Sequence, residues 1–453
     1  MPSLRTRVAR AVFLTALISL ACPLHAASAD ATDVATSEAP VAPSGAPASR
    51  GSELAIVSPA DGLVLAAQGP GVDVPWILSP LVRGTGGAQA LWTARDESGL
   101  LLRLGGGWAD VQSTGDAPPF QRPPSRRWNL DGTELVWRHD GGEFYASMQR
   151  RNWGPGWTGS LILDGAAQPL AAVGWRRPRP LQSSSPWLKW MGPWSADVFF
   201  GRLSGHEEPQ RPALIGMRLQ VQPFEPLQFG LSRALQWGGH GRDESAESLV
   251  RAVFGADNVG SYGVTRDNEP GNQLGGFDFR LQLGDDAGNA LYGQAIGEDK
   301  AGGLPSGYIV QAGLQGHALA LGADWLGFLE WNDTIVGDAY KSSGSPGVAY
   351  RHSIYQQGYT NDHMPLGYPA GGDVTLTSVG LLARMAAVQM KAVASRGNAL
   401  PTAQRFAPGP ISGLNGSLQV DIEPHHQVGA ALWWWRDSAE QQSAVQLWFS
   451  LRL

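Results

Sequence analysis

The stretch Gln236-Trp237-Gly238-Gly239-His240-Gly241-Arg242-Asp243-Glu244-Ser245 lies between two segments in which apolar and polar residues alternate. The first alternating segment is 227–233, and in the second the apolar residues Phe277, Phe279, Leu281 and Leu283 alternate with polar ones. A period of two is that of a β-strand with one apolar and one polar face. The residues between the strands are rich in charged, amide and aromatic side chains. This arrangement is typical of a barrel wall that carries a functional loop.

The rest of the chain repeats this pattern. Alternation recurs over 215–222, 308–315, 418–423 and 445–453, and Asp140-Gly141-Gly142 predicts a hairpin turn. The chain has 59 glycines in 453 residues, against a usual share of about 7%. About 400 residues at roughly 22 per strand and connection predict about 18 strands. We expect an all-β fold, a transmembrane antiparallel β-barrel of about 18 strands; a soluble β-sandwich is the alternative, because it would alternate in the same way.

The N-terminal part of the chain predicts export. Three arginines precede a short apolar run over 12–21, and Ala27-Ser28-Ala29 fits a cleavage site. The single cysteine, Cys22, lies in this region, so the mature chain would hold no thiol or disulfide. The expected segments are a signal peptide at 1–29, a disordered linker at 30–50, a short N-terminal periplasmic segment at 51–90 and an outer-membrane β-barrel at 91–453.

The charged residues of the strands predict which face of the wall points into the lumen and which faces lipid. An arginine at the bilayer midplane on the lipid face costs about 2–4 kcal/mol. The faces that carry Arg218, Arg280 and Arg452 are therefore expected to point into the lumen, and the aliphatic faces outward. Trp433-Trp434-Trp435 are consecutive, so at least one of these side chains must point inward. The last strand ends on Leu453, and a large apolar residue there is typical of outer-membrane barrels.

Two tryptophan-rich segments each have two interpretations. An indole ring can stack on a sugar ring, or it can anchor the barrel in the membrane interface. Both interpretations apply to Trp153-Gly154-Pro155-Gly156-Trp157 and to the segment 186–194. The interfacial one is favoured for both, and more strongly for 186–194. The loop at 355–373, rich in tyrosine and amide groups, suits a neutral, hydroxyl-rich ligand or else a structured plug or rim loop.

No motif for catalysis or metal binding is present in the sequence. The histidines lack metal-ligand spacing, and no nucleophile elbow, P-loop or dinucleotide fingerprint occurs. The acids Asp243, Glu244, Asp267 and Glu269 could form a glycosidase pair, but a lumen network with Arg233, Arg242 and Arg266 is the favoured interpretation. The net charge of −6, without a basic run, makes nucleic acid an unlikely partner by chemistry. We expect no catalytic residues, no metal and no cofactor, and hence no enzyme.

Several motifs occur in an order that resembles the Wzi family of capsule-assembly outer-membrane proteins. They are Trp-Gly-Pro-Gly (153–156), Gly-Pro-Trp (192–194), Gln-Trp-Gly-Gly-x-Gly-Arg-x-Glu-Ser (236–245), Asp-Asn-Glu-Pro-Gly-Asn-Gln-Leu-x-Gly-Phe-Asp-Phe (267–279), 292–306 and Ile-Tyr-Gln-Gln-Gly-Tyr (354–359). The resemblance covers residues 130–375. It implies a monomeric barrel of about 18 strands whose lumen is occluded and which acts as a lectin for capsular or extracellular polysaccharide. The N-terminal helical periplasmic segment of such proteins has no counterpart in 51–90.

The main hypothesis is therefore a polysaccharide-binding protein of the outer membrane that attaches the polymer to the cell surface and assists capsule assembly. Its expected partners are the polysaccharide, outer-membrane lipids and, during insertion, the barrel-assembly machinery. The candidate sugar-binding residues are Trp237, His240, Arg242, Glu269, Asn272, Tyr355, Gln356 and Tyr359. The alternative is an outer-membrane diffusion channel for sugars or other solutes, because a barrel of this width leaves room for a pore unless it is filled.

Overall fold

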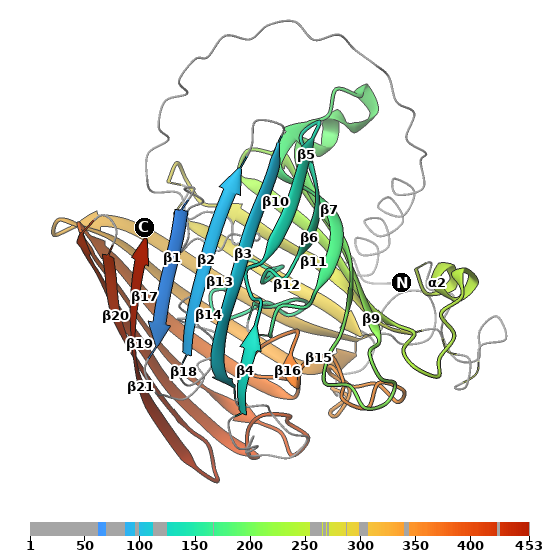
Figure 1. Ribbon diagram of the computed structural model, residues 1–453. Helices are drawn as coiled ribbons and strands as arrows, with labels where there is room; N and C mark the ends of the chain where they lie inside the picture. Colours follow the sequence, from blue (N-terminus) through green and yellow to red (C-terminus); the bar gives the residue numbers. More distant parts are fainter. Residues whose placement is uncertain are drawn as a thin grey trace, which may run out of the picture. The chain divides into compact units, whose positions relative to one another are not determined.

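The computed structural model describes residues 62–68, 87–95, 99–111, 125–165, 167–253, 265, 269, 271–286, 288–298, 307–338, 344–423 and 426–452. Nineteen strands of this part of the chain form one sheet, and two short strands pair separately (Figure 1). The strands of the sheet are β1 (Gly62–Gln68), β2 (Gly87–Arg95), β3 (Leu100–Val111), β4 (Ser125–Asn129), β5 (Glu134–His139), β6 (Gly142–Ser147), β7 (Ala172–Gln182), β8 (Pro193–Arg202), β9 (Ala213–Phe224), β10 (Leu227–Trp237), β11 (Gly271–Gln282), β12 (Ala290–Glu298), β13 (Gly307–Ala320), β14 (Ala323–Asp338), β17 (Val374–Met385), β18 (Val388–Ala399), β19 (Gly409–Glu423), β20 (His426–Arg436) and β21 (Gln441–Arg452). The other elements are β15 (Thr360–Asn361), β16 (Met364–Pro365), the 3-10 helix η1 (Pro186–Met191) and the helix α2 (Ala246–Val253).

The sheet closes on itself. Each described strand pairs antiparallel with its neighbour in the chain, and β1 pairs with both β2 and β21. Strand β4 pairs only with β3, where it continues the line of β5, so eighteen strands form the closed ring. The prediction of an antiparallel β-barrel of about 18 strands is confirmed. None of the helices that the structure describes is long and apolar enough to cross a membrane.

Short turns join most of the described strands at one end of the barrel, the connection through η1 excepted, and most connections at the other end are longer loops. The β5–β6 turn is of the short kind: Asp140 and Gly141 both have positive φ, 49° and 69°, as a two-residue type I′ hairpin requires. The long connections at that other end include those after β6, β8, β10, β14 and β18. Because periplasmic turns are short and extracellular loops long in outer-membrane barrels, we assign the long-loop end to the cell exterior.

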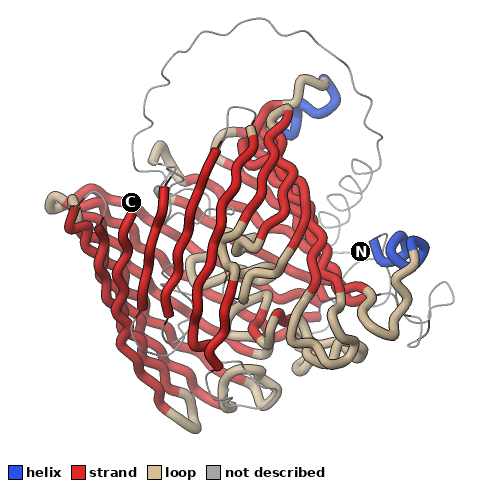
Figure 2. Tube along the Cα trace, viewed as in Figure 1, coloured by secondary structure: helices blue, strands red, loops and turns tan. Residues whose placement is uncertain are grey.

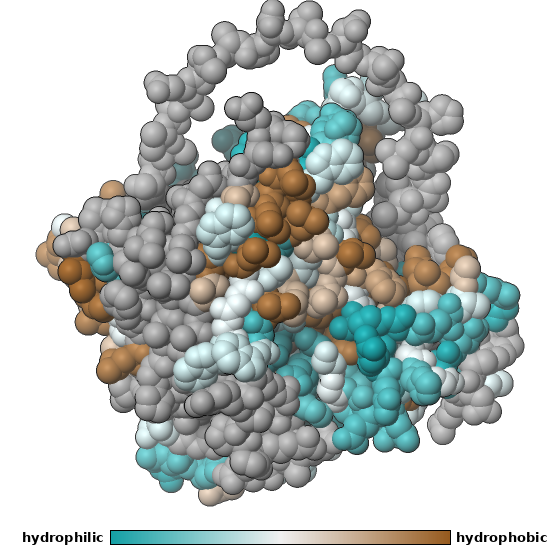
Figure 3. Space-filling view, in the orientation of Figure 1, coloured by the Kyte–Doolittle hydropathy of each residue, from teal (hydrophilic) through white to brown (hydrophobic). Residues whose placement is uncertain are grey.

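The two faces of the wall differ in chemistry. Arg218 is 8% exposed and its guanidinium donates to both carboxylate oxygens of Asp278, at 2.7 and 3.0 Å, inside the lumen. On the outer face Phe229 and Phe277 stack with their ring centroids 5.9 Å apart. Exposed leucine, valine and tryptophan side chains continue this apolar surface, and Figure 3 shows apolar atoms across the front of the wall with hydrophilic ones toward its lower end. The predicted assignment of faces is confirmed at these positions, whereas the side chain of Arg452 lies outside the described part.

The segment between β6 and β7 fills the lumen. Leu161, Ile162 and Leu163 of this plug (148–171, described except for 166) are at most 2% exposed. Wall side chains hold its backbone: Glu330 accepts from the amide N–H of Trp157 at 2.6 Å, and Gln311 donates to the carbonyl of Gly159 at 2.9 Å. Loop segments are visible behind the front strands in Figure 2. The lumen is thus occupied by protein, as the resemblance implied.

The wall begins earlier in the chain than predicted. Strand β1 and the start of β2 fall within 51–90, which the sequence assigned to a periplasmic segment, yet both belong to the barrel sheet. Gly62–Gln68 is short and carries Ala66 and Ala67 where a strand usually has larger residues, so its alternation is weak. The signal peptide (1–29) and the linker (30–50) lie outside the described residues.

Candidate polysaccharide-binding rim

Three loops meet at the long-loop end. We call them the rim: residues 203–212 after β8, residues 238–245 after β10, and residues 344–373 between β14 and β17. The amide N–H of His240 donates to the carbonyl of Gln210 at 2.8 Å, and that of Asp362 donates to the carbonyl of Ser204 at 2.7 Å. The side chain of Gln236 donates to the carbonyl of Gly358 at 3.0 Å. The rim is therefore one hydrogen-bonded surface built from three distant parts of the sequence.

Trp237 supports the rim from the outer side of the barrel. Its ring is 5% exposed and packs in a cluster with Leu235 and Ala252, under helix α2. The indole Nε1–H donates to the hydroxyl of Ser248 at 3.0 Å. Arg233, which the sequence placed in a lumen network, instead donates to the carbonyl of Ala252 at 3.0 Å and so satisfies the last turn of α2.

Asn272, Tyr355 and Tyr359 lie in the interior of the rim, each about 1% exposed. Asn272 donates to the side-chain oxygen of Gln236 at 2.8 Å, and the ring of Tyr359 stacks on Tyr350 at 6.2 Å. Burial in this apolar interior raises the pKa of both Tyr355 and Tyr359, so both phenols are neutral at physiological pH. These side chains hold the loops together and present no surface to a polymer in this structure.

Arg242 and Glu269 lie at an intermediate depth. The guanidinium of Arg242 donates to the backbone carbonyl of Glu269 at 2.6 Å, and the Glu269 carboxylate lies 3.4 Å from Nε2 of His352. The His352 ring in turn packs at 5.7 Å from Tyr355. Both candidate residues thus lie where the loop after β10 contacts the loop that precedes β17, a contact that we call the seam.

His240 and Gln356 are the exposed members of the predicted set. The side chain of Gln356 donates to the carboxylate of Glu208 at 3.0 Å, which brings a third loop to the same surface. Gln210 and Arg211 are exposed beside them. The structure therefore brings all eight predicted residues to one end of the barrel, but it places only His240 and Gln356 fully at its surface.

An ion pair fixes the edge of the rim. Arg202 donates to both carboxylate oxygens of Glu244, one of them at 2.9 Å, and this pairing lowers the pKa of Glu244 to about 2. The Glu244 carboxylate also accepts from the amide N–H of Gly239 at 2.9 Å. Elsewhere in the rim, burial lowers the pKa of His206, whose Nε2 lies 2.9 Å from the carbonyl of Thr360. The loop turn at Gly238–Gly239 is thus held by a carboxylate that stays ionised.

Aromatic stacking on sugars finds little support in the described rim. No tryptophan or tyrosine of its described residues is classed as exposed. Trp153 is 2% exposed inside the lumen, where its ring lies 5.5 Å from Phe199, and Trp157 stacks on Phe328 at 5.7 Å. Neither lies in a membrane girdle, so the interfacial interpretation of this segment was wrong: its glycines and prolines shape a plug.

Sequence reasoning missed the loop after β8. Its exposed residues Glu207, Glu208, Gln210 and Arg211 form much of the polar surface beside His240. The sequence does contain a sign of this loop, because the polar run 204–212 separates two alternating segments. Among the residues that the structure describes, no group of three or more His, Cys, Asp or Glu side chains is placed to hold a metal ion.

The family model for the capsule assembly protein Wzi matches residues 138–425, well over half of the chain. The chain belongs to the Wzi family. This confirms the resemblance seen in the sequence motifs.

Individual relatives agree with the family assignment. An uncharacterised 55.8 kDa protein in the cps region of Klebsiella pneumoniae is 34% identical over 227 residues, which cover 49% of this chain and 44% of that protein. The match thus spans less than half of the relative's length. The Escherichia coli structure described as Wzi, an outer membrane protein involved in group 1 capsule assembly and a carbohydrate-binding β-barrel, matches with a TM-score of 0.72 and 22% identity. That match covers 87% of this chain and 85% of the E. coli chain, so the two share the Wzi barrel fold.

Other outer-membrane proteins are more distant. The outer membrane protein opdK from Pseudomonas aeruginosa matches with a TM-score of 0.45 and 12% identity, over 86% of this chain and 97% of that one. A likeness at this level carries no argument about function.

Proposed function

We propose that this Wzi-family chain binds capsular or extracellular polysaccharide at the rim and attaches it to the cell surface, which assists capsule assembly. The observation that carries the proposal is the rim itself: a hydrogen-bonded, polar surface on top of a plugged barrel. The carbohydrate binding described for the E. coli relative supports it.

The predicted residues would divide into two roles. His240 and Gln356 would contact the polymer, together with the exposed Gln210 of the neighbouring loop. Arg242 and Glu269 would set the charge of the seam beneath, with Arg242 available to pair with acidic sugars. The buried residues Trp237, Asn272, Tyr355 and Tyr359 would position the loops. Contacts of this polar kind are individually weak, and repeats along one polymer would add avidity.

The plug argues against the diffusion channel. Its backbone makes direct hydrogen bonds to Gln294, Gln311 and Glu330, which lie on three adjacent strands of the wall. A solute path through the lumen would require these contacts to break. We likewise propose that the chain has no catalytic activity, that it acts as a monomer among outer-membrane lipids, and that the barrel-assembly machinery inserts it.

The test is polysaccharide partitioning in a deletion strain complemented with the full chain. The cell-bound and medium-released glycan are measured separately. An unchanged total with a shift into the medium in the deletion strain is the expected result. Loss of total glycan would point instead to synthesis or export, and no change in either fraction would contradict attachment.

A further inference from the structure

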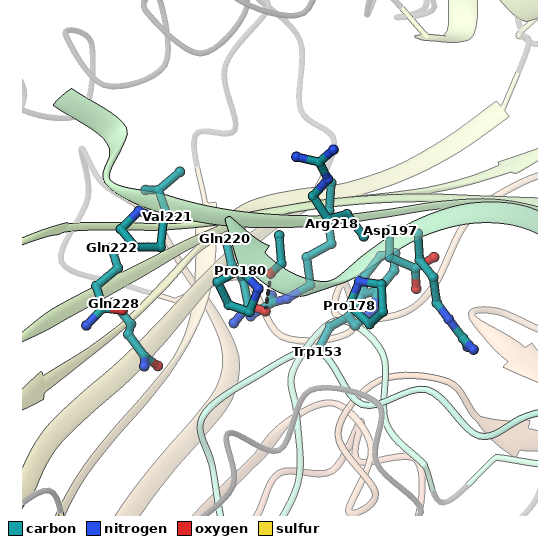
Figure 4. Close-up of a pocket in the computed structure, with 14 residues that line it drawn as sticks. Trp153, Pro178, Pro180, Asp197, Arg218, Gln220, Val221, Gln222 and Gln228 are labelled. Carbon is teal, nitrogen blue, oxygen red and sulfur yellow. Dashed lines mark hydrogen bonds between the residues drawn. The ribbon is translucent and has the colours of Figure 1, made fainter. Parts of the chain in front are cut away.

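The outer face of the barrel wall carries two arginines near its short-turn end. The first is Arg177 of β7, whose guanidinium carbon lies 4.4 Å from the ring centroid of Trp194 on β8. Trp194 pairs directly with Val221 of β9, and direct partners in a sheet share one face. Figure 4 shows Val221 on the opposite side of the strands from Trp153, which is buried in the lumen. Arg177 and Trp194 therefore face outward.

The side chain of Arg177 lies close to the periplasmic end of the wall. A Cβ atom on Gly141, in the β5–β6 turn, would lie 4.0 Å from its Nη2 and 3.3 Å from Cδ1 of Leu181. This turn belongs to the short-turn end, which is opposite the end assigned to the cell exterior. An arginine on the lipid face costs least near a membrane interface, because its long stem lets the charge reach the headgroups. The guanidinium of Arg177 is therefore at the height of lipid headgroups.

A bulge at the end of β7 adds the second arginine to this surface. Pro178 and Pro180 line a cavity on the lumen side of the wall (Figure 4). Arg179, between them, is exposed and does not line this cavity, so it lies on the outer side. The register between β7 and β8 shifts between Arg177 and Leu181, where the prolines have no N–H to donate. The bulge thus leaves two arginines, two residues apart, on the outer face.

The connection after β7 supplies exposed tryptophans and a lysine. In η1, Trp187 is 87% exposed and Trp190 is 57% exposed. Lys189 is also exposed, and its carbonyl accepts from Nε2 of Gln182 at 3.4 Å, which places it at the end of β7. Tryptophan favours the membrane interface, because its ring is apolar and its N–H is polar. We call the following six residues the interfacial patch: Arg177, Arg179, Trp187, Lys189, Trp190 and Trp194.

The cations of the interfacial patch have no acidic partners in the described part of the chain. Neither Arg177, Arg179 nor Lys189 forms an ion pair with a carboxylate there, in contrast to Arg176 next to them in the sequence. The Nε–H of Arg177 is buried and has no acceptor among the same residues. A buried donor of this kind gains stability when an acceptor arrives, and an arginine fork matches the paired oxygens of a carboxylate or phosphate.

The acidic groups nearby leave the interfacial patch with a net positive charge. Asp140 and Glu225, in the adjoining turns, are exposed, and these two carboxylates stand against three cations. Asp197 and Glu143 lie on the other side of the wall, in the lumen, where Arg176 binds Glu143 at 2.6 Å. At the height of the headgroups, the anion that meets an outward-facing arginine is the phosphodiester of a phospholipid. A net positive surface favours a headgroup that carries no cation of its own.

We propose that the interfacial patch binds an anionic glycerophospholipid of the periplasmic leaflet. The phosphodiester oxygens accept from the guanidinium groups of Arg177 and Arg179, and Lys189 adds a third positive charge. The acyl chains lie along the wall, where Val173 and Val198 are exposed on the same outer face. The site is at the opposite end of the barrel from the rim, so it does not depend on polysaccharide binding.

The test uses the full chain purified in an uncharged detergent and native mass spectrometry, which counts the bound lipids. The probe is dioleoylphosphatidylglycerol, and dioleoylphosphatidylcholine is its zwitterionic counterpart. We expect the first phosphatidylglycerol to bind at least fivefold more tightly than the first phosphatidylcholine. The double variant Arg177→Gln/Arg179→Gln should reduce this preference to less than twofold. The matched control Arg384→Gln/Arg396→Gln removes two exposed arginines of β17 and β18 and should keep the preference.

Three results would overturn the proposal. One is equal binding of the two lipids by the wild type. Another is the same preference in the wild type and the Arg177/Arg179 variant, or an equal loss in that variant and the control, which would assign the preference to overall charge. The third is binding of inorganic phosphate as tight as that of phosphatidylglycerol, measured by equilibrium dialysis, which would identify a site for the free anion. Heat-dependent gel migration checks that every variant is a folded barrel.

Discussion

The side-chain amide of Gln294 donates to the carbonyl oxygen of Trp153 at 2.7 Å. Its oxygen accepts from the amide N–H of Leu161, also at 2.7 Å. Gln294 therefore holds the backbone of the plug at two points. Glu330 holds it at two more, because its carboxylate accepts from the amide N–H groups of Trp157 and Thr158. These two wall side chains thus bond four backbone groups of the plug.

Removing the side chains of Gln294 and Glu330 should open a conducting path through the lumen. In Gln294→Ala/Glu330→Ala the plug backbone loses its acceptors, and each buried amide left unsatisfied costs about 1–3 kcal/mol. We expect discrete conductance steps in a planar bilayer for this variant and silence for the wild type. Gln282→Ala, which changes an exposed turn contact to Gly284, is the control and should stay silent. Silence of the double variant would show that the plug is held by its apolar core.

The barrel should be more stable with the Arg218–Asp278 pair intact, or with both charges removed, than with one charge removed. Asp278→Ala leaves a guanidinium buried in the wall and should lower the free energy of unfolding by about 3–5 kcal/mol. Arg218→Met/Asp278→Leu removes both charges and should lower it by less. Urea unfolding in lipid vesicles measures both values, and equal losses would contradict the argument.

Polymer retention should depend on the exposed rim residues. His240→Ala/Gln356→Ala removes two surface contacts, and because avidity multiplies small losses we expect the cell-bound fraction of glycan to fall several-fold. Gln427→Ala, a matched amide loss that breaks a bond to Asp421 at the short-turn end, serves as the control. Full retention of the polymer by a folded double variant would show that these two residues do not contact it.

Trp237 should act through helix α2. Trp237→Phe loses the Nε1–H bond to Ser248, worth about 1 kcal/mol, and should speed tryptic cleavage after the exposed Arg251 several-fold. Ser248→Ala should have the same effect, and the two changes together should add little. Additive effects would mean that the bond does not couple the two residues.

Glu244 should titrate near pH 2. Its pKa is lowered to about 2 from an ordinary 4.5, chiefly by hydrogen bonds from Arg202. A lowered pKa contributes stability that is present above about pH 4.5 and is lost as the pH falls toward 2. Carbon-13 NMR of labelled glutamate carboxylates measures the midpoint, with Glu244→Gln for assignment. Arg202→Gln should move the midpoint upward, and an unmoved midpoint would assign the shift to another cause.

Strand pattern and loop composition predicted the architecture well because both depend on local sequence. Alternation identified β9 and β11 and their lumen faces, and Trp435 points inward as the run of three tryptophans required, donating to Asn415 at 3.1 Å. In β10 it identified the strand but not the position of Arg233, which lies under α2. The eight candidate residues were brought to one end of the barrel for the same reason. Their depth was not predictable, since Tyr355 is covered by loops more than a hundred residues away in sequence.

The plug was also beyond sequence reasoning. Trp153 and Trp157 sit in a Gly-Pro segment that is compatible with a turn at the membrane interface, and only partners such as Gln294 and Glu330 decide that the segment folds inward. Those partners are more than 130 residues away along the chain. Local patterns carry no information about which distant side chain will supply an acceptor.

The position of the plug in the chain has a consequence for biogenesis. The plug follows β6, whereas Gln294, Gln311 and Glu330, which hold it, lie on β12, β13 and β14, and the ring is sealed by the pairing of β21 with β1. The hydrogen bonds that hold the plug can form only once these later strands are in place. We therefore expect the lumen to become occluded as the ring closes, so that assembly of the wall and of the plug is a single process.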